Sequence, residues 1–344
     1  MPTADRFQRV IQNAQEVVTE EELRGILSAK TRTTAYVGFE LSGLAHLGGV
    51  IIANKLRDFT QASVKTTVLL ADWHSFINDK FGGDWERIHL AGECLKDFFT
   101  SLGAAEGVEF LYASDLVSRA EYWRTVLAVA KNASLSRMKR ALSIMGRREE
   151  DAELDSSKII YPAMQVTDIH VLDIDIALGG MDQRHAHMLY RDLAPKLGWK
   201  NVVALHTPLL TSLMGQGRMD PIEGKMSKSR PDSAIFPHDS PAEIKKKIQN
   251  AYCPPGISVG NPVAEIWKYI LFPALQEVRI ERESRFGGDL EFKSYSDLES
   301  AYASGSLHPQ DLKGGAAHSL AQVLEPARKY FEKHPENLNA IRGE

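Results

Sequence analysis

Short apolar runs typical of β-strands recur between residues 35 and 206, and helical patterns separate them. The strand-like runs are Ala35–Glu40, Thr66–Ala71, Glu109–Tyr112, Ile174–Leu178 and Val202–His206. Amphipathic helical patterns lie between them, for example over Glu86–Leu102 and Asp182–Leu197. Strands that alternate with helices form a doubly wound parallel sheet, which binds ligands at the carboxyl ends of its strands. The sequence therefore predicts an α/β fold with a Rossmann-like parallel sheet.

The strand pattern fades after Pro231, and helical patterns follow over Pro241–Ala251, Ala264–Leu271 and Leu312–Phe331. A chain of 344 residues is long enough for about two domains. We therefore expect a Rossmann-like domain over residues 1–230 and an all-α domain over residues 231–344. A basic, helical segment over about residues 118–160 fits no strand–helix unit, and we expect it to be an insertion in the first domain.

Composition narrows the class of protein. The hydrophobic and charged fractions, 43% and 25%, are ordinary for a globular chain. A net charge of −4 does not indicate a nucleic-acid partner, so any RNA contact must come from local basic patches. The chain shows no apolar run typical of a signal peptide or a membrane span, so we expect a cytoplasmic protein without a membrane partner. Cys94 and Cys253 lack the spacing of a zinc site, so we expect no structural zinc and no other resident metal.

The segment Lys225–Ser229 has the sequence KMSKS and follows a glycine-containing stretch from Gly215 to Gly224. Its two lysines supply positive charges, its serines supply hydroxyl donors, and the glycines permit sharp turns. This combination favours a loop that binds a polyphosphate, because such loops need donors and cations on a flexible backbone. An ordinary solvated basic turn has a similar composition.

A second phosphate-binding element is predicted just after the strand Ala35–Glu40. Ser42 and Gly43 break the strand, and His46 then precedes an apolar helical stretch that runs to Leu56. A helix N-terminus has unpaired N–H groups and a partial positive charge, so it binds anions. His46 can donate a hydrogen bond to a phosphate oxygen there. Alone it would be interpreted as a capping or surface histidine, and the lysine loop favours the phosphate role.

A polar face is predicted on the helix over residues 157–170. Tyr161, Gln165 and Asp168 recur at the spacing of one helix face, within an arc of about 60°. A phenol, an amide and a carboxylate need partners if they are buried. A solvent-facing stripe is the alternative interpretation. The run Gly179–Arg184 follows a predicted strand, at the expected ligand position, and adds the amide of Gln183.

These motifs resemble those of the class I aminoacyl-tRNA synthetases, in which the KMSKS loop accompanies a His-x-Gly-His motif. Here the second histidine of that motif is Gly49, which removes one donor. Further matching stretches narrow the resemblance to the tyrosyl-tRNA synthetases of the archaeal and eukaryotic kind. They cover nearly the whole chain and are residues 35–40, 69–72, 161–170, 179–184, 225–229, 251–254, 286–289 and 307–311.

The resemblance implies ATP-dependent activation of L-tyrosine and its transfer to tRNA(Tyr). It assigns the substrate's phenolic hydroxyl to Tyr36 and Asp168, and the substrate's ammonium to Tyr161, Gln165 and Gln183. Hydrogen-bonding chemistry supports the assignment of Tyr36 and Asp168, because a neutral hydroxyl can donate to a carboxylate and accept from a tyrosine. Phenylalanine would leave both partners unpaired.

For ATP, the resemblance implies that His46, Lys225 and Lys228 stabilise the reacting phosphates and are the catalytic residues, with Mg²⁺ accompanying the nucleotide. The ATP-binding residues it implies are Gly38, Glu40, His46, Gly48, Lys225 and Lys228. Little covalent chemistry is asked of the protein, since positioning and charge neutralisation carry the rate.

For tRNA, the resemblance implies that the first domain is catalytic and that the helical domain binds the anticodon. Arg140 and Arg184 match positions that contact the acceptor stem, and Phe286, His308 and Asp311 match the anticodon site. Arg140 belongs to a basic run with Arg137, Lys139, Arg147 and Arg148, for which a solvated helix face is the alternative interpretation. A homodimer is also implied.

Three alternatives remain open at this point. A tryptophanyl relative is disfavoured because an indole has no hydroxyl to employ both Tyr36 and Asp168. A cytidylyltransferase-like nucleotidyltransferase is disfavoured by the helical C-terminal domain and the KMSKS sequence. A non-catalytic RNA-binding paralogue is suggested by Gly49.

Overall fold

The structure of the chain is a computed structural model that describes residues 2–29, 32–146, 155–215, 226 and 233–343. Two compact units are present. The first comprises Met1–Gly43, Ile52–Pro208 and Ala340–Glu344, and the second comprises Leu44–Ile51 and Leu209–Asn339. The second unit therefore begins before residue 231, where the sequence places the domain boundary. It also takes in the short segment that carries His46.

A six-stranded sheet forms the centre of the first unit, in the order β1-β6-β5-β2-β3-β4. All the ladders are parallel except β1–β6. The doubly wound parallel sheet predicted from the sequence is confirmed, with shifted strand ends. The edge strand β1 is missing from the prediction because three residues are too short to show an alternating pattern. The strands are β1 (Glu16–Val18), β2 (Thr33–Phe39), β3 (Val64–Leu70), β4 (Val108–Tyr112), β5 (Ile176–Gly180) and β6 (Val203–Thr207).

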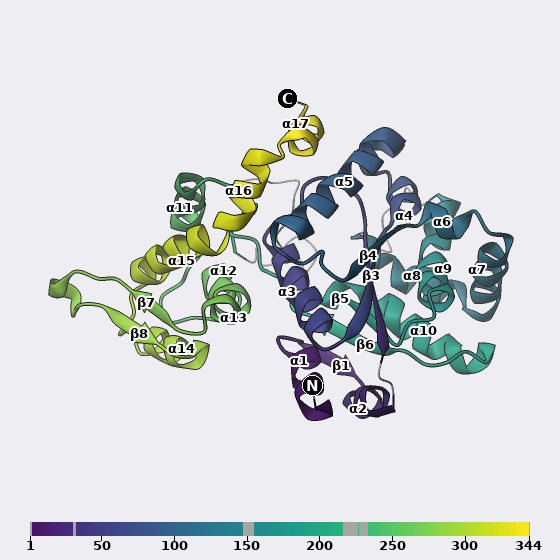
Figure 1. Cartoon of the computed structure of the whole chain (residues 1–344), viewed down its shortest axis with the longest axis horizontal. Coiled ribbons are helices and arrows are strands. Elements are labelled where there is room, and N and C mark those ends of the chain that lie inside the picture. The colour runs from purple at the N-terminus through teal and green to yellow at the C-terminus, as the bar shows by residue number, and fades with distance from the viewer. Residues whose placement is uncertain (1, 30–31, 147–154, 216–225, 227–232, 344) are drawn as a thin grey trace. The chain divides into compact units, whose positions relative to one another are not determined.

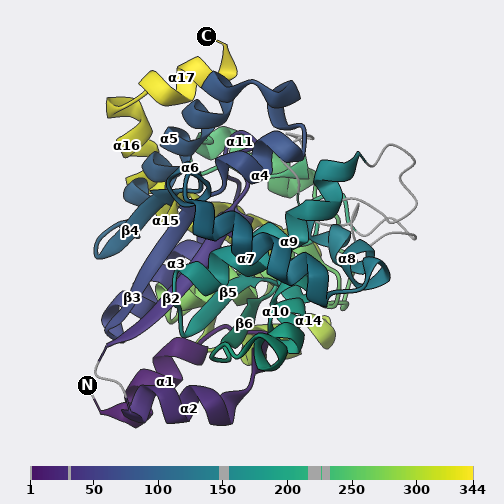
Figure 2. The same cartoon turned by 90° about the vertical axis from the view of Figure 1, so that its right-hand side faces the viewer.

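Helices cover both faces of this sheet, with α3 on one face and α9 and α10 on the other (Figures 1 and 2). The helices that begin in this part of the chain are α1 (Thr3–Ile11), α2 (Glu20–Ala29), α3 (Gly48–Gln61), α4 (Asp72–Ile77), η1 (Lys80–Gly83), α5 (Trp85–Ser101), α6 (Ser114–Val117), α7 (Ala120–Asn132), α8 (Leu135–Ala141), η2 (Leu142–Met145), α9 (Ser156–Val171), η3 (Met181–Gln183) and α10 (Arg184–Leu197). The predicted insertion is helical where the structure describes it, as α7, α8 and η2. These elements pack with α9 and α10 around one apolar core that includes Val126, Leu142 and Leu189.

The second unit is mainly helical, with one short antiparallel pair, β7–β8. The predicted helix over Leu312–Phe331 is in fact two helices. Pro326 lies in the first turn of the second one, and it lacks the N–H that a continuous helix would need. The elements are α11 (Pro241–Asn250), α12 (Pro262–Ile266), η5 (Trp267–Leu271), α13 (Phe272–Leu275), β7 (Val278–Ile280), η6 (Ser284–Phe286), β8 (Leu290–Phe292), α14 (Tyr295–Ala303), α15 (Pro309–Val323), α16 (Glu325–Lys333) and α17 (Glu336–Arg342).

Candidate active site

The order of the strands reverses between β2 and β5. From β2 the sheet continues through β3 to β4, and from β5 it continues through β6. Open α/β sheets bind ligands at the carboxyl edge of such a switch point. Phe39 ends β2 there and leads to Glu40, while Gly180 ends β5 and leads into η3 with Gln183. The carboxyl edge therefore brings together chain segments that are far apart in the sequence.

Helix α9 brings three of the predicted residues to this edge. Asp155 caps its first turn by accepting hydrogen bonds from the backbone N–H groups of Ser157 and Lys158. The polar face predicted on this helix is present, but it is not exposed to solvent. Tyr161, Gln165 and Asp168 retain 5%, 7% and 0% of their accessible surface, which makes the solvent-facing interpretation wrong.

Asp168 forms the most buried end of this cluster. Its Oδ1 accepts a hydrogen bond from the Tyr122 hydroxyl at 2.8 Å. Its Oδ2 lies 3.1 Å from Nε2 of the buried His74, yet it has no hydrogen-bond partner among the described residues. The ion pair with His74 offsets part of the cost of burying this carboxylate, and a donor from a ligand could add a hydrogen bond to the same oxygen.

The phenols and the histidine around Asp168 have altered acidity. Burial, and next the negative charge of Asp168, raise the pKa of Tyr36 well above its usual value. Burial likewise raises the pKa of Tyr122, and Asp168 adds to the effect. Burial opposes protonation of His74, but the Asp168, Glu40 and Asp72 carboxylates outweigh it and raise the pKa of His74. Both tyrosines are therefore neutral donors at pH 7, facing a carboxylate.

A second polar group surrounds Glu40, beside Tyr161. The Tyr161 hydroxyl donates to Glu40 Oε1 at 2.8 Å, and Asn78 Nδ2 donates to the same oxygen at 2.7 Å. Lys80 forms an ion pair with Glu40 Oε2 at 3.2 Å. Carboxylate and phenol oxygens grouped in this way suit a cationic ligand group such as an ammonium.

Two amides complete the cluster of polar side chains around Asp168 and Glu40. Gln165 Nε2 donates to Gln183 Oε1 at 3.1 Å, and Gln183 Nε2 donates to the carbonyl oxygen of Ile144 at 3.3 Å. The first bond joins α9 to η3. The five residues predicted to bind tyrosine thus come together in one group in the first unit: Tyr36, Tyr161, Gln165, Asp168 and Gln183.

The segment with His46 belongs to the second unit, at the start of α3. The Gly48 N–H donates to His46 Nδ1 at 3.0 Å. A neutral imidazole whose Nδ1 accepts carries its proton on Nε2, so His46 presents an N–H donor there. A β-carbon at Gly48 would lie 2.7 Å from His46 Cε1. Any larger residue at position 48 would therefore displace the His46 ring.

The two predicted phosphate-binding motifs are connected within this unit. The Leu47 N–H, beside His46, donates to the carbonyl oxygen of Ile235 at 2.7 Å. Ile235 follows the KMSKS segment in the chain. Lys225 and Lys228 themselves lie outside the described residues. Met226 between them is described, is 3% exposed, and donates its N–H to the Leu210 carbonyl oxygen at 2.9 Å.

The residues predicted to contact tRNA lie in both units. In the first unit, Arg140 is exposed on α8, and Arg184 Nε forms an ion pair with Glu16 at 2.8 Å. In the second unit, His308 is exposed and caps α15, accepting from the backbone N–H of Gln310 at 3.2 Å. Arg147 and Arg148 of the basic run lie outside the described residues.

The segments that carry the predicted anticodon residues are joined by an arginine that the sequence analysis missed. Asp311 is half-buried in the first turn of α15, and its Oδ2 lies 3.8 Å from Arg282. Arg282 also donates to the carbonyl oxygens of Gly288 and Ser306, at 2.8 and 3.0 Å. Arg282 therefore joins the two chain segments beside this site. The side chain of Phe286 lies outside the described residues.

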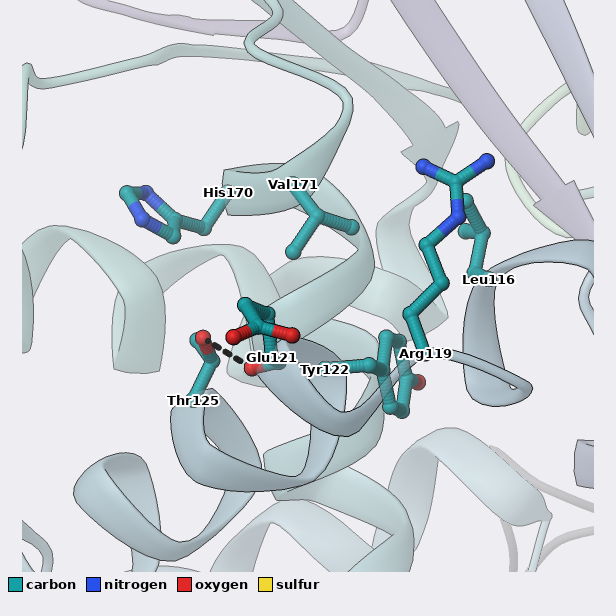
Figure 3. Close-up of a pocket in the computed structure, with 7 residues that line it drawn as sticks. All are labelled: Leu116, Arg119, Glu121, Tyr122, Thr125, His170 and Val171. Atoms are coloured by element: carbon teal, nitrogen blue, oxygen red, sulfur yellow. Dashed lines mark hydrogen bonds between the residues drawn. The ribbon is translucent and has the colours of Figure 1, made fainter.

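A cavity of about 380 Å³ lies in the first unit, and Tyr122, whose hydroxyl donates to Asp168, is one of the residues that line it (Figure 3). Figure 3 shows the side chains that line it, and Thr125 in its wall donates to the backbone of Glu121 at 3.0 Å. The lining residues are Leu116, Arg119, Glu121, Tyr122, Thr125, His170 and Val171.

Two further findings concern metals and membranes. Among the described residues, no three His, Cys, Asp or Glu side chains are grouped so that they could hold a metal ion. Burial raises the pKa of the Cys94 thiol to about 12, which makes that thiol a poor metal ligand. The described helices include none that is long and apolar enough to cross a membrane.

His74 and Tyr122 are absent from the predicted site, although both contact Asp168. Tyr122 lies on α7, in the segment interpreted as a basic insertion, so its contact with α9 comes from tertiary packing. His74 follows the run Leu69–Asp72, which the sequence analysis used only as a matching stretch. A buried histidine two residues beyond an aspartate after a strand is the signal that was available.

Known proteins resemble this chain over nearly its whole length. A family model described as tRNA synthetases class I (W and Y) matches residues 28–325. A tyrosine–tRNA ligase of Saccharolobus islandicus is 49% identical over 98% of this chain and 96% of its own length. The crystal structure of tyrosyl-tRNA synthetase from Aeropyrum pernix has a TM-score of 0.90 and 45% identity, covering 99% of each chain. The Pyrococcus horikoshii synthetase complexed with L-tyrosine has a TM-score of 0.93 and 40% identity, covering 100% of each. This chain belongs to the class I tRNA synthetases of the W and Y family.

Proposed function

We propose that this chain is a tyrosine–tRNA ligase, which activates L-tyrosine with ATP and transfers it to tRNA(Tyr). The observation that carries the proposal is the buried carboxylate of Asp168 at the switch point of the sheet, whose Oδ2 forms an ion pair with His74 but accepts no hydrogen bond among the described residues. A tyrosine hydroxyl can donate a hydrogen bond to this oxygen. The high identity to tyrosine–tRNA ligases over nearly the whole chain supports the same choice over tryptophan.

The pocket explains how tyrosine would be selected. The substrate hydroxyl donates to Asp168 and accepts from Tyr36, which burial keeps neutral. Tyr122 and His74 hold Asp168 from its other sides. Phenylalanine would leave the Asp168 oxygen unpaired, which costs about 1–3 kcal/mol or more for a charged group.

The other end of the pocket suits the amino acid's charged groups. We assign the substrate ammonium to Tyr161, Gln165 and Gln183, with the negative charge of Glu40 beside them. This assignment orients the substrate carboxylate away from the Asp168 end. The carboxylate attacks the α-phosphorus of ATP, which gives tyrosyl-adenylate and pyrophosphate.

ATP enters as its Mg²⁺ complex, in which the phosphates themselves hold the ion. We assign nucleotide binding to Gly38, Glu40, His46, Gly48 and the KMSKS lysines. The position of His46 at the start of α3 supports this role, because its Nδ1 accepts from the Gly48 N–H and its neutral ring therefore carries the proton on Nε2. Lys225 and Lys228 would neutralise the leaving pyrophosphate. Gly49 offers no side-chain donor, so we assign most of the stabilisation of the phosphate charge to these lysines and His46.

The second step needs tRNA at two places. We assign Arg140 and Arg184 to the acceptor stem, and Phe286, His308 and Asp311 to the anticodon. A carboxylate accepts from the two N–H donors on the Watson–Crick edge of an unstacked guanine, and an aromatic ring stacks on it. In this proposal residues 1–230 carry catalysis and residues 231–344 read the anticodon.

We also propose a cytoplasmic homodimer. Apolar side chains on α7 and near it are exposed: Leu127 is 68% exposed, Leu135 60%, Trp123 38% and Val171 38%. A cluster of this kind is typical of a surface that another chain covers. The cavity of Figure 3 opens on the same helix. Sedimentation velocity of the wild-type chain and of a Leu127→Glu variant tests this part, and a wild-type monomer at micromolar concentration would overturn it.

ATP–pyrophosphate exchange tests the main proposal. We expect exchange with tyrosine, and none with tryptophan or without an amino acid. Asp168→Asn should abolish most of the tyrosine-dependent exchange, and Asp192→Asn, which changes an exposed carboxylate on α10, should not. Exchange with tryptophan alone would favour the tryptophanyl alternative, and no exchange with any amino acid would favour the non-catalytic paralogue.

A further inference from the structure

Two buried histidines form a chain that the proposed reaction does not use. His187 Nδ1 lies 3.0 Å from His206 Nε2, and the two rings are stacked with centroids 5.1 Å apart. His187 retains 1% and His206 0% of their accessible surface. A histidine pair in this setting needs a defined arrangement of protons, because each bond requires one donor and one acceptor.

Glu16 and Arg184 define that arrangement. His206 Nδ1 lies 2.8 Å from Glu16 Oε2, and Arg184 Nε donates to both oxygens of Glu16, at 3.0 and 2.8 Å. The hydrogen bond from Arg184 is the main reason that the pKa of Glu16 is lowered. Glu16 is therefore an acceptor, which places the His206 proton on Nδ1. His206 Nε2 then accepts, and His187 Nδ1 donates.

The far end of the chain reaches the tyrosine pocket. A β-carbon at Gly179 would lie 3.1 Å from His187 Cε1, 2.9 Å from Gln183 Cβ and 3.1 Å from Gln183 Cγ. The His187 ring edge and the Gln183 side chain thus both lie against the same glycine, with no room for a side chain between them. Gln183 is hydrogen-bonded to Gln165, so the histidine pair ends beside a residue of the pocket, with Gly179 between them.

We propose that His206 and His187 are positioning residues that link the Arg184–Glu16 ion pair to Gln183, so that tRNA engaging Arg184 changes the affinity of the pocket for tyrosine. This inference rests on the proposed function, because it takes the acceptor-stem role of Arg184 and the tyrosine role of Gln183 from it. It adds a physical coupling between the two sites.

The coupling works through one proton from solvent. Burial lowers the pKa of His206, and the positive charge of Arg184 adds to the lowering. The negative charges of Glu16 and Asp182 raise this pKa and so oppose the lowering. A tRNA phosphate competes with Glu16 for the Arg184 guanidinium, which removes the contribution of Arg184 and favours a protonated His206. Both nitrogens of a protonated imidazole donate, so His187 Nδ1 must then accept.

The consequence for His187 is a change of tautomer. Burial, and next the charge of His206, lower the pKa of His187 to about 3, so His187 stays neutral and moves its proton from Nδ1 to Nε2. The ring that lies against Gly179 thereby has two discrete protonation patterns. A two-state element that both sites bias is what a coupling of binding affinities requires.

Equilibrium dialysis of labelled L-tyrosine without ATP tests the coupling, with and without tRNA(Tyr), at pH 6.0 and 8.0. We define the coupling ratio as the tyrosine Kd without tRNA(Tyr) compared with the tyrosine Kd with it. For the wild-type chain we expect this ratio to differ from one by about fivefold or more at pH 6.0, a typical size for such coupling, and by less at pH 8.0. Glu16→Gln and His206→Gln should bind tyrosine without tRNA and show a ratio of about one at both pH values.

A matched control is available on the same helix. Arg191 of α10 forms an ion pair with Glu22 at 2.8 Å, with no histidine bonded to Glu22. Glu22→Gln should keep the wild-type ratio. If His206→Gln does not fold, calorimetry of tRNA binding in two buffers of different ionisation enthalpy replaces it: the wild type and Glu22→Gln should take up more protons than Glu16→Gln near pH 6.5.

Two results would overturn the inference and leave the proposed function intact. One is a wild-type tyrosine Kd that tRNA does not change although both ligands bind. The other is a Glu16→Gln variant whose tyrosine Kd changes with tRNA as much as that of the wild type. No binding of tyrosine by the wild-type chain would instead overturn the proposed function.

Discussion

Gly38 leaves the space that the Tyr36 hydroxyl occupies. A β-carbon at position 38 would lie 2.6 Å from that hydroxyl oxygen and 3.2 Å from the adjacent ring carbon. The two residues are two positions apart on β2, so their side chains would point to the same face of the sheet. Glycine at position 38 thus serves the tyrosine pocket as well as the nucleotide site to which we assign it.

Gly38→Ala should move the Tyr36 ring and raise the KM for tyrosine about ten- to a hundredfold, because displacing one hydrogen-bonding group costs about 1–3 kcal/mol. The KM for ATP should change less. ATP–pyrophosphate exchange measures both constants. Gly25→Ala is the matched control, because no atom lies within 4 Å of a β-carbon at that position. Equal effects of the two substitutions would contradict the role of Gly38.

Tyr122→Phe removes the hydrogen bond to Asp168 Oδ1 and leaves this buried oxygen without that donor. We expect weaker tyrosine binding by about 1–3 kcal/mol, with the selectivity against phenylalanine reduced. Exchange kinetics with tyrosine and with phenylalanine check this. Tyr112→Phe is the control, since Tyr112 donates to Glu93 at 2.7 Å and not to the pocket. A Tyr122→Phe enzyme with wild-type constants would show that Asp168 needs no such support.

Lys225→Ala and Lys228→Ala should lower kcat with little change in the tyrosine KM, because the lysines act on the departing pyrophosphate in the transition state. Removal of one such charge typically costs about a hundredfold or more in kcat. Lys245→Ala and Lys246→Ala on α11 provide exposed controls. A rise in the tyrosine KM at constant kcat would assign the lysines to substrate binding.

Arg282→Ala should weaken aminoacylation and leave adenylate formation intact, because Arg282 holds the segments beside Asp311 and Phe286. We expect a loss similar to that of Phe286→Ala, about ten- to a hundredfold if stacking on the anticodon is lost. Asp311→Ala should in addition reduce the preference for guanine over cytosine at the first anticodon position. Aminoacylation of the two tRNAs by each variant measures this, with Arg279→Ala, which contacts Asp289 instead, as the control. An unchanged guanine preference in Asp311→Ala would rule out the anticodon assignment.

His187 should make the fold sensitive to acid. Its pKa falls from 6.5 to about 3 on burial, so below pH 6.5 the unfolded chain binds a proton that the folded chain does not. The free energy of unfolding should therefore decrease between pH 6.5 and 3, by up to about 1.4 kcal/mol per pH unit from this group. Urea unfolding of His187→Asn should show a shallower pH dependence. His318 is exposed, so the His318→Asn variant should keep the wild-type pH dependence of the free energy of unfolding. The same pH dependence in all three proteins would show that His187 does not cause the acid sensitivity.

The sequence was sufficient for strands β2 to β6 and for α9, because the alternating pattern of the strands and the spacing of Tyr161, Gln165 and Asp168 are local patterns. The contacts of Asp168 with His74 and Tyr122 were not predictable in this way, since α4, α7 and α9 meet only through tertiary packing. The same holds for Arg282, because its partner Ser306 is separated from it by β8 and α14. The predicted helix over Leu312–Phe331 was wrong because its apolar spacing continues across Pro326.

The hydrogen bond from Leu47 to Ile235 has a consequence for dissecting the chain into fragments. A fragment that stops at residue 230 retains every strand of the main sheet and the KMSKS sequence. It nevertheless removes the acceptor of the Leu47 N–H, next to His46, together with most of the unit to which Leu44–Ile51 belongs. The shortest piece of this protein able to activate an amino acid is therefore longer than its Rossmann-like sheet.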